Sequence, residues 1–167
     1  MKMELIQPFI SAADAVLASS LDAPPQMGDL SMEEDDYRRK GYAARISIRG
    51  DIEGRIIVDM STETALRLAS ALSGSELRTP DQTVKETIHE LANMIIGNAI
   101  TLLNDHGYKF KVFPPEEDAG ADPSRNKSET EELAVFFDTN CGRIFLSVRM
   151  RYNLRRRLQD SVERSLA

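Results

Sequence analysis

A carboxylate and a carboxamide one helical turn apart are the residues of this chain that best fit a chemical role. Glu90 and Asn93 lie in residues 85–97, which read KETIHELANMIIG. At about 3.6 residues per turn, Glu86 and Gly97 fall on the same helical face as this pair, within about 60° of arc. An acid can bind a cationic group, and a neutral amide can both donate and accept hydrogen bonds. The two side chains could therefore act together on a group presented from outside.

The element that must hold this pair is a long amphipathic helix. We expect Thr79 to cap it and Pro80 to open it, with an end near Asp105 and a stop at His106 and Gly107. Its buried stripe should comprise Val84, Ile88, Leu91, Ile95, Ala99 and Leu102. Glu86, Glu90, Asn93 and Gly97 then lie opposite the stripe, pointing away from the core.

Two residues of the polar face are costly in the middle of a helix. Asn93 is a mediocre helix former, and Gly97 costs about 1 kcal/mol relative to alanine. An exposed glycine permits close approach by another backbone, and Met94 beside it would suit a docking surface. The residues alone leave a plainer interpretation open, in which this face is only the solvated side of an amphipathic helix.

The remaining pattern predicts an α+β sandwich in which an antiparallel sheet packs against helices. Alternation and turn residues place hairpins at 42–60 and 133–149, and a single strand at 108–113. A helix at 10–21 follows Pro8, and a short helix follows a cap at Ser61 or Thr62 and ends before Gly74. Residues 26–40 and the acidic stretch 116–130 are predicted to be solvated connections.

Composition limits the classes of function. The 167 residues, 41% hydrophobic and 29% charged, are typical of one globular domain. No apolar run reaches the about 18 residues that span a bilayer, and the first residues lack the pattern of a secretory signal. Cys141 is the only cysteine, which excludes an internal disulfide and favours the cytoplasm. The net charge of −6 argues against a nucleic-acid binder.

The basic residues gather near the end of the chain, at Arg149, Arg151, Arg155, Arg156 and Arg157. We expect them to mark the solvated face of a terminal helix, because most runs of charge are solvated. A functional basic patch is the less favoured alternative.

Other chemical motifs are incomplete. The run from His89 resembles the H-E-x-x-H zinc motif, but Asn93 stands where the second histidine is needed, and His106 is too distant to replace it. The chain has neither a G-x-S-x-G elbow nor a Walker loop. Cys141 lies in a turn with no histidine near it in sequence, which disfavours a nucleophilic role.

Residues 90–98, ELANMIIGN, resemble the signature of the CheC/CheX/FliY family of bacterial chemotaxis phosphatases, which act on phosphorylated CheY. The resemblance covers about residues 4–150 and includes the Gly50 and Gly142 hairpins and the segments 60–65 and 71–74. CheC-type members carry two Glu-x-x-Asn helices, whereas this chain has one, which favours the CheX branch. Glu86 stands where the family often has aspartate or serine.

The resemblance implies a mechanism. Asn93 would orient the water that attacks the aspartyl phosphate, and Glu90 would dock on the lysine of the receiver domain. Glu86, Gly97 and Met94 would contact the partner, a phosphorylated CheY-like response regulator. The chain would need no cofactor, since the magnesium would belong to the receiver.

The resemblance also implies an organisation. Residues 1–151 would form a CheX-like domain, 152–167 an arginine-rich C-terminal helix or tail, and two copies would dimerise through their sheets. Two alternatives stay open: a module that binds a receiver without hydrolysing its phosphate, and a sheet-mediated structural component of a signalling or flagellar assembly.

Overall fold

The computed structural model describes residues 3–29, 31–32, 41–117 and 132–166. Its helices are α1 (Met3–Ser20), α2 (Thr62–Ser73), α3 (Gln82–Asp105) and α4 (Leu154–Leu166). Its strands are β1 (Gln26–Met27), β2 (Ser31–Met32), β3 (Gly41–Gly50), β4 (Ile52–Ser61), β5 (Phe110–Val112), β6 (Glu116–Glu117), β7 (Glu132–Thr139) and β8 (Gly142–Tyr152).

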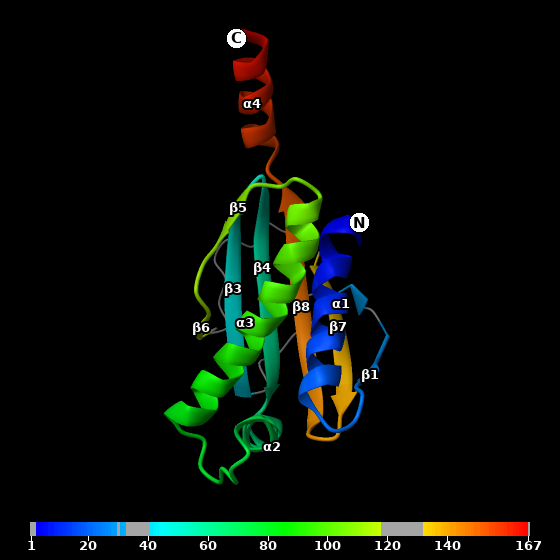
Figure 1. Ribbon diagram of the computed structural model, residues 1–167, viewed down its shortest axis with the longest axis vertical. Coiled ribbons are helices and arrows are strands. Elements are labelled where there is room, and N and C mark those ends of the chain that lie inside the picture. The colour runs from blue at the N-terminus through cyan, green and yellow to red at the C-terminus, as the bar shows by residue number, and fades with distance from the viewer. Residues whose placement is uncertain (1–2, 30, 33–40, 118–131, 167) are drawn as a thin grey trace.

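The strands form one antiparallel sheet built from two long hairpins. Its order is β1-β7-β8-β4-β3-β5, with β2 also pairing with β7 and β6 with β3. The β3–β4 and β7–β8 hairpins join where β4 pairs with β8, with Ile56 opposite Val148. Helices α1 and α3 cross one face of this sheet, and α2 lies at one end of it (Figure 1). The predicted α+β sandwich is confirmed.

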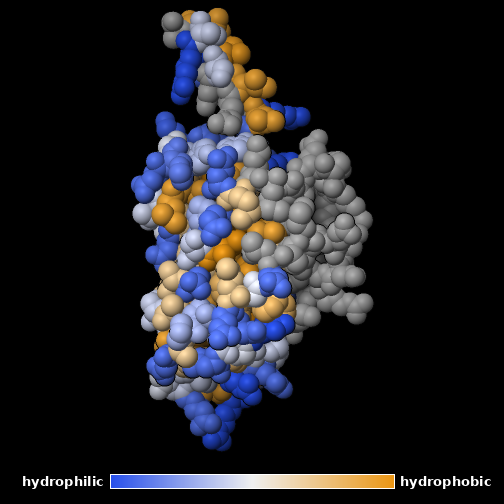
Figure 2. Space-filling model, turned by 90° about the vertical axis from the view of Figure 1, so that its right-hand side faces the viewer, coloured by the Kyte–Doolittle hydropathy of each residue, from blue (hydrophilic) through white to orange (hydrophobic). Residues whose placement is uncertain are grey.

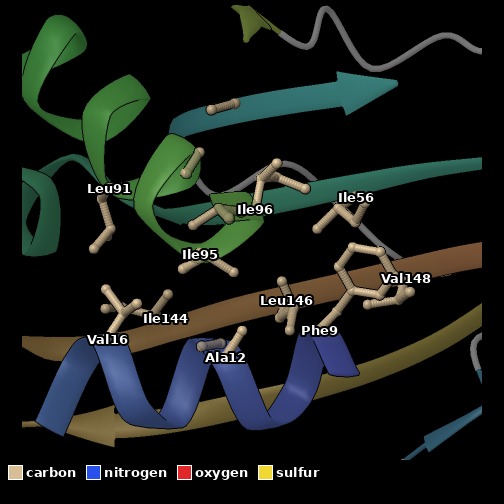
Figure 3. Packing of buried hydrophobic residues seen from close by; sticks show 14 of the residues in the cluster. Phe9, Ala12, Val16, Ile56, Leu91, Ile95, Ile96, Ile144, Leu146 and Val148 are labelled. Atoms are coloured by element: carbon tan, nitrogen blue, oxygen red, sulfur yellow. The ribbon is translucent and has the colours of Figure 1, made fainter. Parts of the chain in front are cut away.

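The core lies between that sheet face and the two long helices. Alternate residues of the central strands point toward the helices, as the period of two in a strand requires. Figure 3 shows them meeting α1 and α3 side chains, with Phe9 against Val148 and Ile95 near Ile144. Each fully buried aliphatic side chain of this kind stabilises the fold by about 1.5–3 kcal/mol. This packing holds α3 rigidly across the sheet.

Helix α1 begins earlier than the sequence indicates. It starts at Met3 and passes through Pro8, whereas the pattern predicts a start near Ile10. An interior proline removes one backbone hydrogen bond and is ordinarily disruptive. Here Leu5, Ile6 and Phe9 are all buried in the core. Their burial outweighs the local cost of the proline.

The predicted solvated connections contain short strands. Within 26–40, β1 and β2 pair with β7, and within 116–130, β6 pairs with β3. Two-residue strands have no alternation that a sequence could display. These short strands form only because their backbones pair with β7 or β3 in the folded sheet. Residues 33–40 and 118–131 lie outside the described residues.

The arginines at the end of the chain do not share one helix. Arg149 and Arg151 belong to β8, and Arg149 is only 7% exposed. Arg151 lies 2.7 Å from the carboxylate of Glu53 on the neighbouring strand. The predicted solvated terminal helix exists only from Leu154, as α4. For Arg149 and Arg151 the prediction of a terminal helix was wrong, because β8 extends the sheet to Tyr152. None of the described helices is both long and apolar enough to cross a membrane.

Candidate functional site

Helix α3 starts at a cap that differs from the one predicted from the sequence. Asp81 is the N-cap, and its carboxylate accepts hydrogen bonds from the backbone N–H groups of Thr83 at 3.0 Å and Val84 at 3.3 Å. The predicted cap at Thr79 and start at Pro80 are therefore wrong by two residues. Asp81 was recognisable, since aspartate is a preferred N-cap. The helix ends as predicted, with Gly107 in the left-handed region at φ 81°.

The buried face of α3 agrees with the predicted apolar stripe except at its end, where Leu103 is buried in place of Leu102. Val84, Ile88, Leu91, Ile95 and Ala99 are buried, as are Ala92, Ile96 and Leu103. Leu102, predicted to be buried, is 43% exposed, whereas Leu103 is 0% exposed. The helical period places Leu102 within the predicted stripe, but the buried face is wider and, with Ala92 and Ile96, shifted toward the side of Leu103. Packing against the neighbouring elements determines which of the two leucines is buried.

The outer face carries every residue that the sequence analysis proposed for the site. Glu86, Glu90, Asn93 and Gly97 are all exposed, and Met94 beside them is 47% exposed. Side chains three residues apart on a helix stand about 5–6 Å from each other at Cβ. The acid and the amide are therefore presented together to solvent by a stiff element.

The polar side chains of Glu90 and Asn93 are not engaged by other residues of the fold. Within the part of the chain that the structure describes, the side chains of Glu90 and Asn93 make no hydrogen bond or ion pair. Glu86 accepts a hydrogen bond of 3.4 Å from the Gln82 amide. Asn98, one turn beyond Met94, donates to the Met94 carbonyl at 3.2 Å. The motif pair is free for an external ligand, whereas its neighbours are partly engaged.

Gly97 leaves a notch in this face. A Cβ placed there would meet no atom within 4 Å. The packing of the described residues therefore gives no reason for glycine at this position, although it costs about 1 kcal/mol relative to alanine in a helix. The open space instead admits a close approach from outside.

A pocket among the described residues lies elsewhere. It has a volume of about 520 Å³ and opens at the start of α3, lined by Tyr42, Thr62, Asp81, Lys85 and His89 among others. Glu90 and Asn93 do not line it. The pair lies on the exposed outer face of α3, outside this pocket, which suits a macromolecular partner better than a small molecule.

Two other candidates gain no support. Within the described residues, no three His, Cys, Asp or Glu side chains are grouped to hold a metal ion. Cys141 is buried in the β7–β8 turn, and burial raises the pKa of its thiol. A raised pKa leaves less of the thiolate that a nucleophile requires.

Comparison with known proteins decides the family. The profile of the chemotaxis phosphatase CheX family matches residues 42–138, which is more than half of the chain. The chain belongs to this family. It is therefore a phosphatase of the chemotaxis class, as the motif on α3 predicted, and the matched segment contains the whole of that helix. Helix α4 lies outside the match.

Individual relatives agree with this assignment. The CheY-P phosphatase CheX of Thermotoga maritima is 28% identical over 123 residues, covering 73% of this chain and 79% of the relative. A chain of the CheX-CheY-BeF3-Mg complex from Borrelia burgdorferi is 31% identical, with a TM-score of 0.74 over 88% of this chain and 97% of that chain.

A CheC-like superfamily protein from Shewanella has a TM-score of 0.78 at 22% identity, covering 90% of this chain and 99% of that chain. At this identity the likeness shows the fold alone.

Proposed function

We propose that this chain accelerates hydrolysis of the aspartyl phosphate on a CheY-like response regulator, with the outer face of α3 inserted at the phosphorylation site. The observation that carries the proposal is the exposed, unoccupied pair of Glu90 and Asn93 on a rigidly packed helix. The CheY-P phosphatase named among the relatives and the complex of a relative with CheY support the choice of substrate.

Asn93 would act on the attacking water. In the reaction the water oxygen bonds to phosphorus while the bond to the aspartate oxygen breaks, releasing phosphate and a free carboxylate. A carboxylate is a good leaving group, so the main requirement is a water held in line with the breaking bond. The Asn93 carboxamide can accept a hydrogen bond from that water and donate one to a phosphoryl oxygen, and it stays neutral at cellular pH.

Glu90 would fix the register of the two proteins. A carboxylate one turn before Asn93 can pair with the lysine of a receiver active site, and such charge-assisted contacts strengthen when water is excluded. Glu86 extends the acidic row, while Met94 and Gly97 give the partner an apolar contact and a close approach.

We further propose a cytoplasmic homodimer that needs no cofactor of its own. The magnesium ion would be held by the receiver, and no step is assigned to a metal on this chain. The lone Cys141 fits a reducing compartment.

Single-turnover decay of a phosphorylated receiver tests the proposal. We expect Asn93→Ala to lower the rate at saturating enzyme by about 100-fold or more, as loss of a transition-state hydrogen bond commonly does. Docking of the variant should change little. We expect Glu90→Ala mainly to weaken docking, by about 10- to 100-fold, since it leaves the receiver lysine unpaired.

Asn98→Ala is the matched control, because it removes an exposed amide from the same helix five residues farther on. Its rate and docking should stay near those of the unaltered chain. Full activity of Asn93→Ala would show that the role assigned to Asn93 is wrong. Tight binding without any acceleration by the unaltered chain would instead identify a non-catalytic receiver-binding module.

A further inference from the structure

Helix α4 presents a row of aliphatic side chains to solvent. Leu154, Leu158, Val162 and Leu166 are 66%, 68%, 55% and 82% exposed. We call these four residues the aliphatic stripe. Because they recur every four residues, they follow one side of the helix, and Figure 2 shows a row of orange along one side of the projecting helix. Within the part of the chain that the structure describes, no other element covers the stripe.

The base of α4 is anchored to the body, although the rest of the helix is not packed. The backbone N–H of Asn153, the residue before α4, donates to the Asp51 carbonyl at 2.9 Å. The Asn153 side-chain amide donates to the Gly50 carbonyl at 3.0 Å. The helix therefore leaves the β3–β4 turn from a fixed residue and projects from that end of the body (Figure 1).

Basic residues dominate the start of α4. Residues 154–166 contain four arginines against one aspartate and one glutamate, which gives a net charge of +2. Three of the arginines stand at 155–157, and the first turn contains no acidic residue. Positive charge there opposes the helix macrodipole, whose N-terminal end is itself positive. Anionic groups outside the helix would remove this repulsion.

Three exposed cations of the body lie next to the base of α4. Arg49 precedes the β3–β4 turn, and Lys111 is paired opposite Arg49 on β5. Lys109 is joined to the turn by its backbone: its carbonyl accepts from the Asp51 N–H at 2.8 Å, and its N–H donates to the Asp51 carboxylate at 2.8 Å. Since Asp51 also binds Asn153, these cations lie at the end of the body from which α4 projects.

We propose that α4 docks on an anionic phospholipid surface, with the aliphatic stripe at the boundary between headgroups and acyl chains. An amphipathic helix of this kind lies in the plane of the interface and is bound by its apolar area and by attraction to anionic lipid. Arginine side chains can reach the phosphates while their aliphatic parts stay near the apolar boundary. With 13 residues, α4 is shorter than the about 20 residues that cross a bilayer, so the docking is peripheral.

The spread of the stripe favours a lipid surface over a second helix. At about 100° per residue, each step of four residues turns by about 40°, so the four side chains cover about 120° of arc. A paired helix requires a narrow seam that recurs every 3.5 residues on average. A flat and deformable lipid surface accepts the broader face.

The negative charge of the rest of the chain does not prevent this contact. The whole chain carries −6, so the residues outside 154–166 carry −8. Charges farther apart than the Debye length, about 8 Å at physiological ionic strength, are largely screened from each other. The lipid surface therefore interacts mainly with α4 and with the cations at its base.

Docking through α4 leaves the outer face of α3 accessible. The end of α3 at Asp105 lies toward the end of the body that carries α4 (Figure 1). Asn93 lies 12 residues earlier, which is about 18 Å along the helix. A receiver can therefore reach Asn93 while α4 is on lipid. The docking concerns where the chain is held and does not depend on the function proposed above.

Flotation of the full chain with lipid vesicles tests the docking. We expect binding to vesicles of phosphatidylglycerol mixed with phosphatidylcholine, and at least about tenfold weaker binding to phosphatidylcholine alone. Binding should also weaken as added salt screens the arginines. A chain that does not float with the phosphatidylglycerol vesicles overturns the proposal, and its stripe then serves a protein partner. Equal binding to both kinds of vesicle overturns the electrostatic part.

A double variant, Leu158→Ala with Val162→Ala, tests the stripe. Alanine is the best helix former, so this variant keeps α4 helical and removes only apolar area. We expect vesicle affinity to fall by about 10- to 100-fold. Gln159→Ala is the matched control, because it changes an exposed residue of α4 outside the stripe and also favours the helix. Undiminished binding by the double variant would contradict the proposal.

Two charge variants test the role of the arginines. Arg155→Glu should lower vesicle affinity by about 5- to 30-fold, since each basic residue near an anionic surface contributes about a factor of five. Glu163→Arg makes the opposite change on the same helix and should raise the affinity. Effects of the same sign would indicate a general disturbance of α4 and would contradict the assignment.

Receiver decay measured without vesicles separates this docking from the proposed phosphatase activity. The double alanine variant should dephosphorylate a receiver in solution at the unaltered rate, because α4 lies at the far end of the body from the first turns of α3 (Figure 1). Loss of both lipid binding and solution activity in this variant would show that α4 supports the fold of the body, and the assigned role would be wrong.

Discussion

Position 93 combines two properties that are hard to obtain from one side chain. A carboxamide can both accept and donate hydrogen bonds, and it carries no charge that would repel a phosphoryl group. A carboxylate at this position would face the phosphoryl oxygens with like charge. In the proposed function, separating the charged Glu90 from the neutral Asn93 by one turn would let each act on a different part of the receiver. This division belongs to the function proposed above.

Gly97 offers a residue-scale prediction in which stability and docking move in opposite directions. We expect Gly97→Ala to raise the free energy of unfolding by about 0.5–1 kcal/mol, because the added Cβ meets no atom and the helix interior favours alanine. Docking on a phosphorylated receiver should weaken slightly, and Gly97→Leu should weaken it strongly. Urea denaturation and receiver titrations measure the two effects.

Gly74 provides the opposite control. It follows α2 in the left-handed region at φ 71° with open space around it, so a side chain there is strained rather than crowded. Gly74→Ala should therefore lower the free energy of unfolding by about 1 kcal/mol. If Gly97→Leu docked as tightly as the unaltered chain, the notch would have no role in recognition.

At the scale of the element, α3 has its start set by one side chain. We expect Asp81→Ala to lower the free energy of unfolding by about 0.5–2 kcal/mol, because two backbone N–H groups of the first turn lose their acceptor. The rate at saturating receiver should stay unchanged, since Asn93 lies more than three turns farther along. Urea denaturation and single-turnover decay measure these quantities.

Thr79→Ala distinguishes the observed cap from the one that the sequence pattern indicated. Thr79 is exposed and its side chain does not cap α3, so its replacement should change stability by less than about 0.5 kcal/mol. Equal losses from the two variants would mean that the first turn depends on more than the Asp81 carboxylate.

At the scale of the whole molecule, one hydrogen-bonded cluster joins the first helix, the last strand of the sheet and the segment after α3. The Tyr152 hydroxyl at the end of β8 donates to the Glu4 carboxylate on α1 and lies 3.1 Å from the Tyr108 hydroxyl. Burial, followed by the hydrogen bonds to Glu4 and Tyr108, raises the pKa of Tyr152 above its ordinary value near 10. The folded protein therefore holds this proton more tightly than the unfolded chain does.

The direction of the pH dependence follows from that difference. The contribution of Tyr152 is fully present below the ordinary tyrosine pKa of about 10 and decreases as the pH rises above it, because the unfolded chain then releases the proton first. We expect the stability difference between the unaltered chain and Tyr152→Phe to shrink between about pH 9 and pH 11. Denaturant titrations across this range measure it, and a constant difference would contradict the assignment.

Much of the architecture was readable from local patterns. The two hairpins, a cap at Ser61 or Thr62, of which the structure shows Ser61, and a helix end before Gly74 follow from alternation and turn chemistry. The outward direction of Glu90 and Asn93 follows from the period of one long helix with a continuous apolar stripe. These features depend on residues close together in the sequence, so they can be predicted from the sequence alone.

Only the tertiary structure decided the features in which long-range burial outweighs local preference. Helix α1 continues through Pro8 because the core accepts its apolar side chains, and Leu103 rather than Leu102 is buried because the neighbouring elements cover that flank. Arg149 is buried because β8 runs on in the sheet. The residues at the site and the chemistry they allow came from sequence. The open, unoccupied surface on which they stand came from the packing of distant segments, which alone determines what remains exposed.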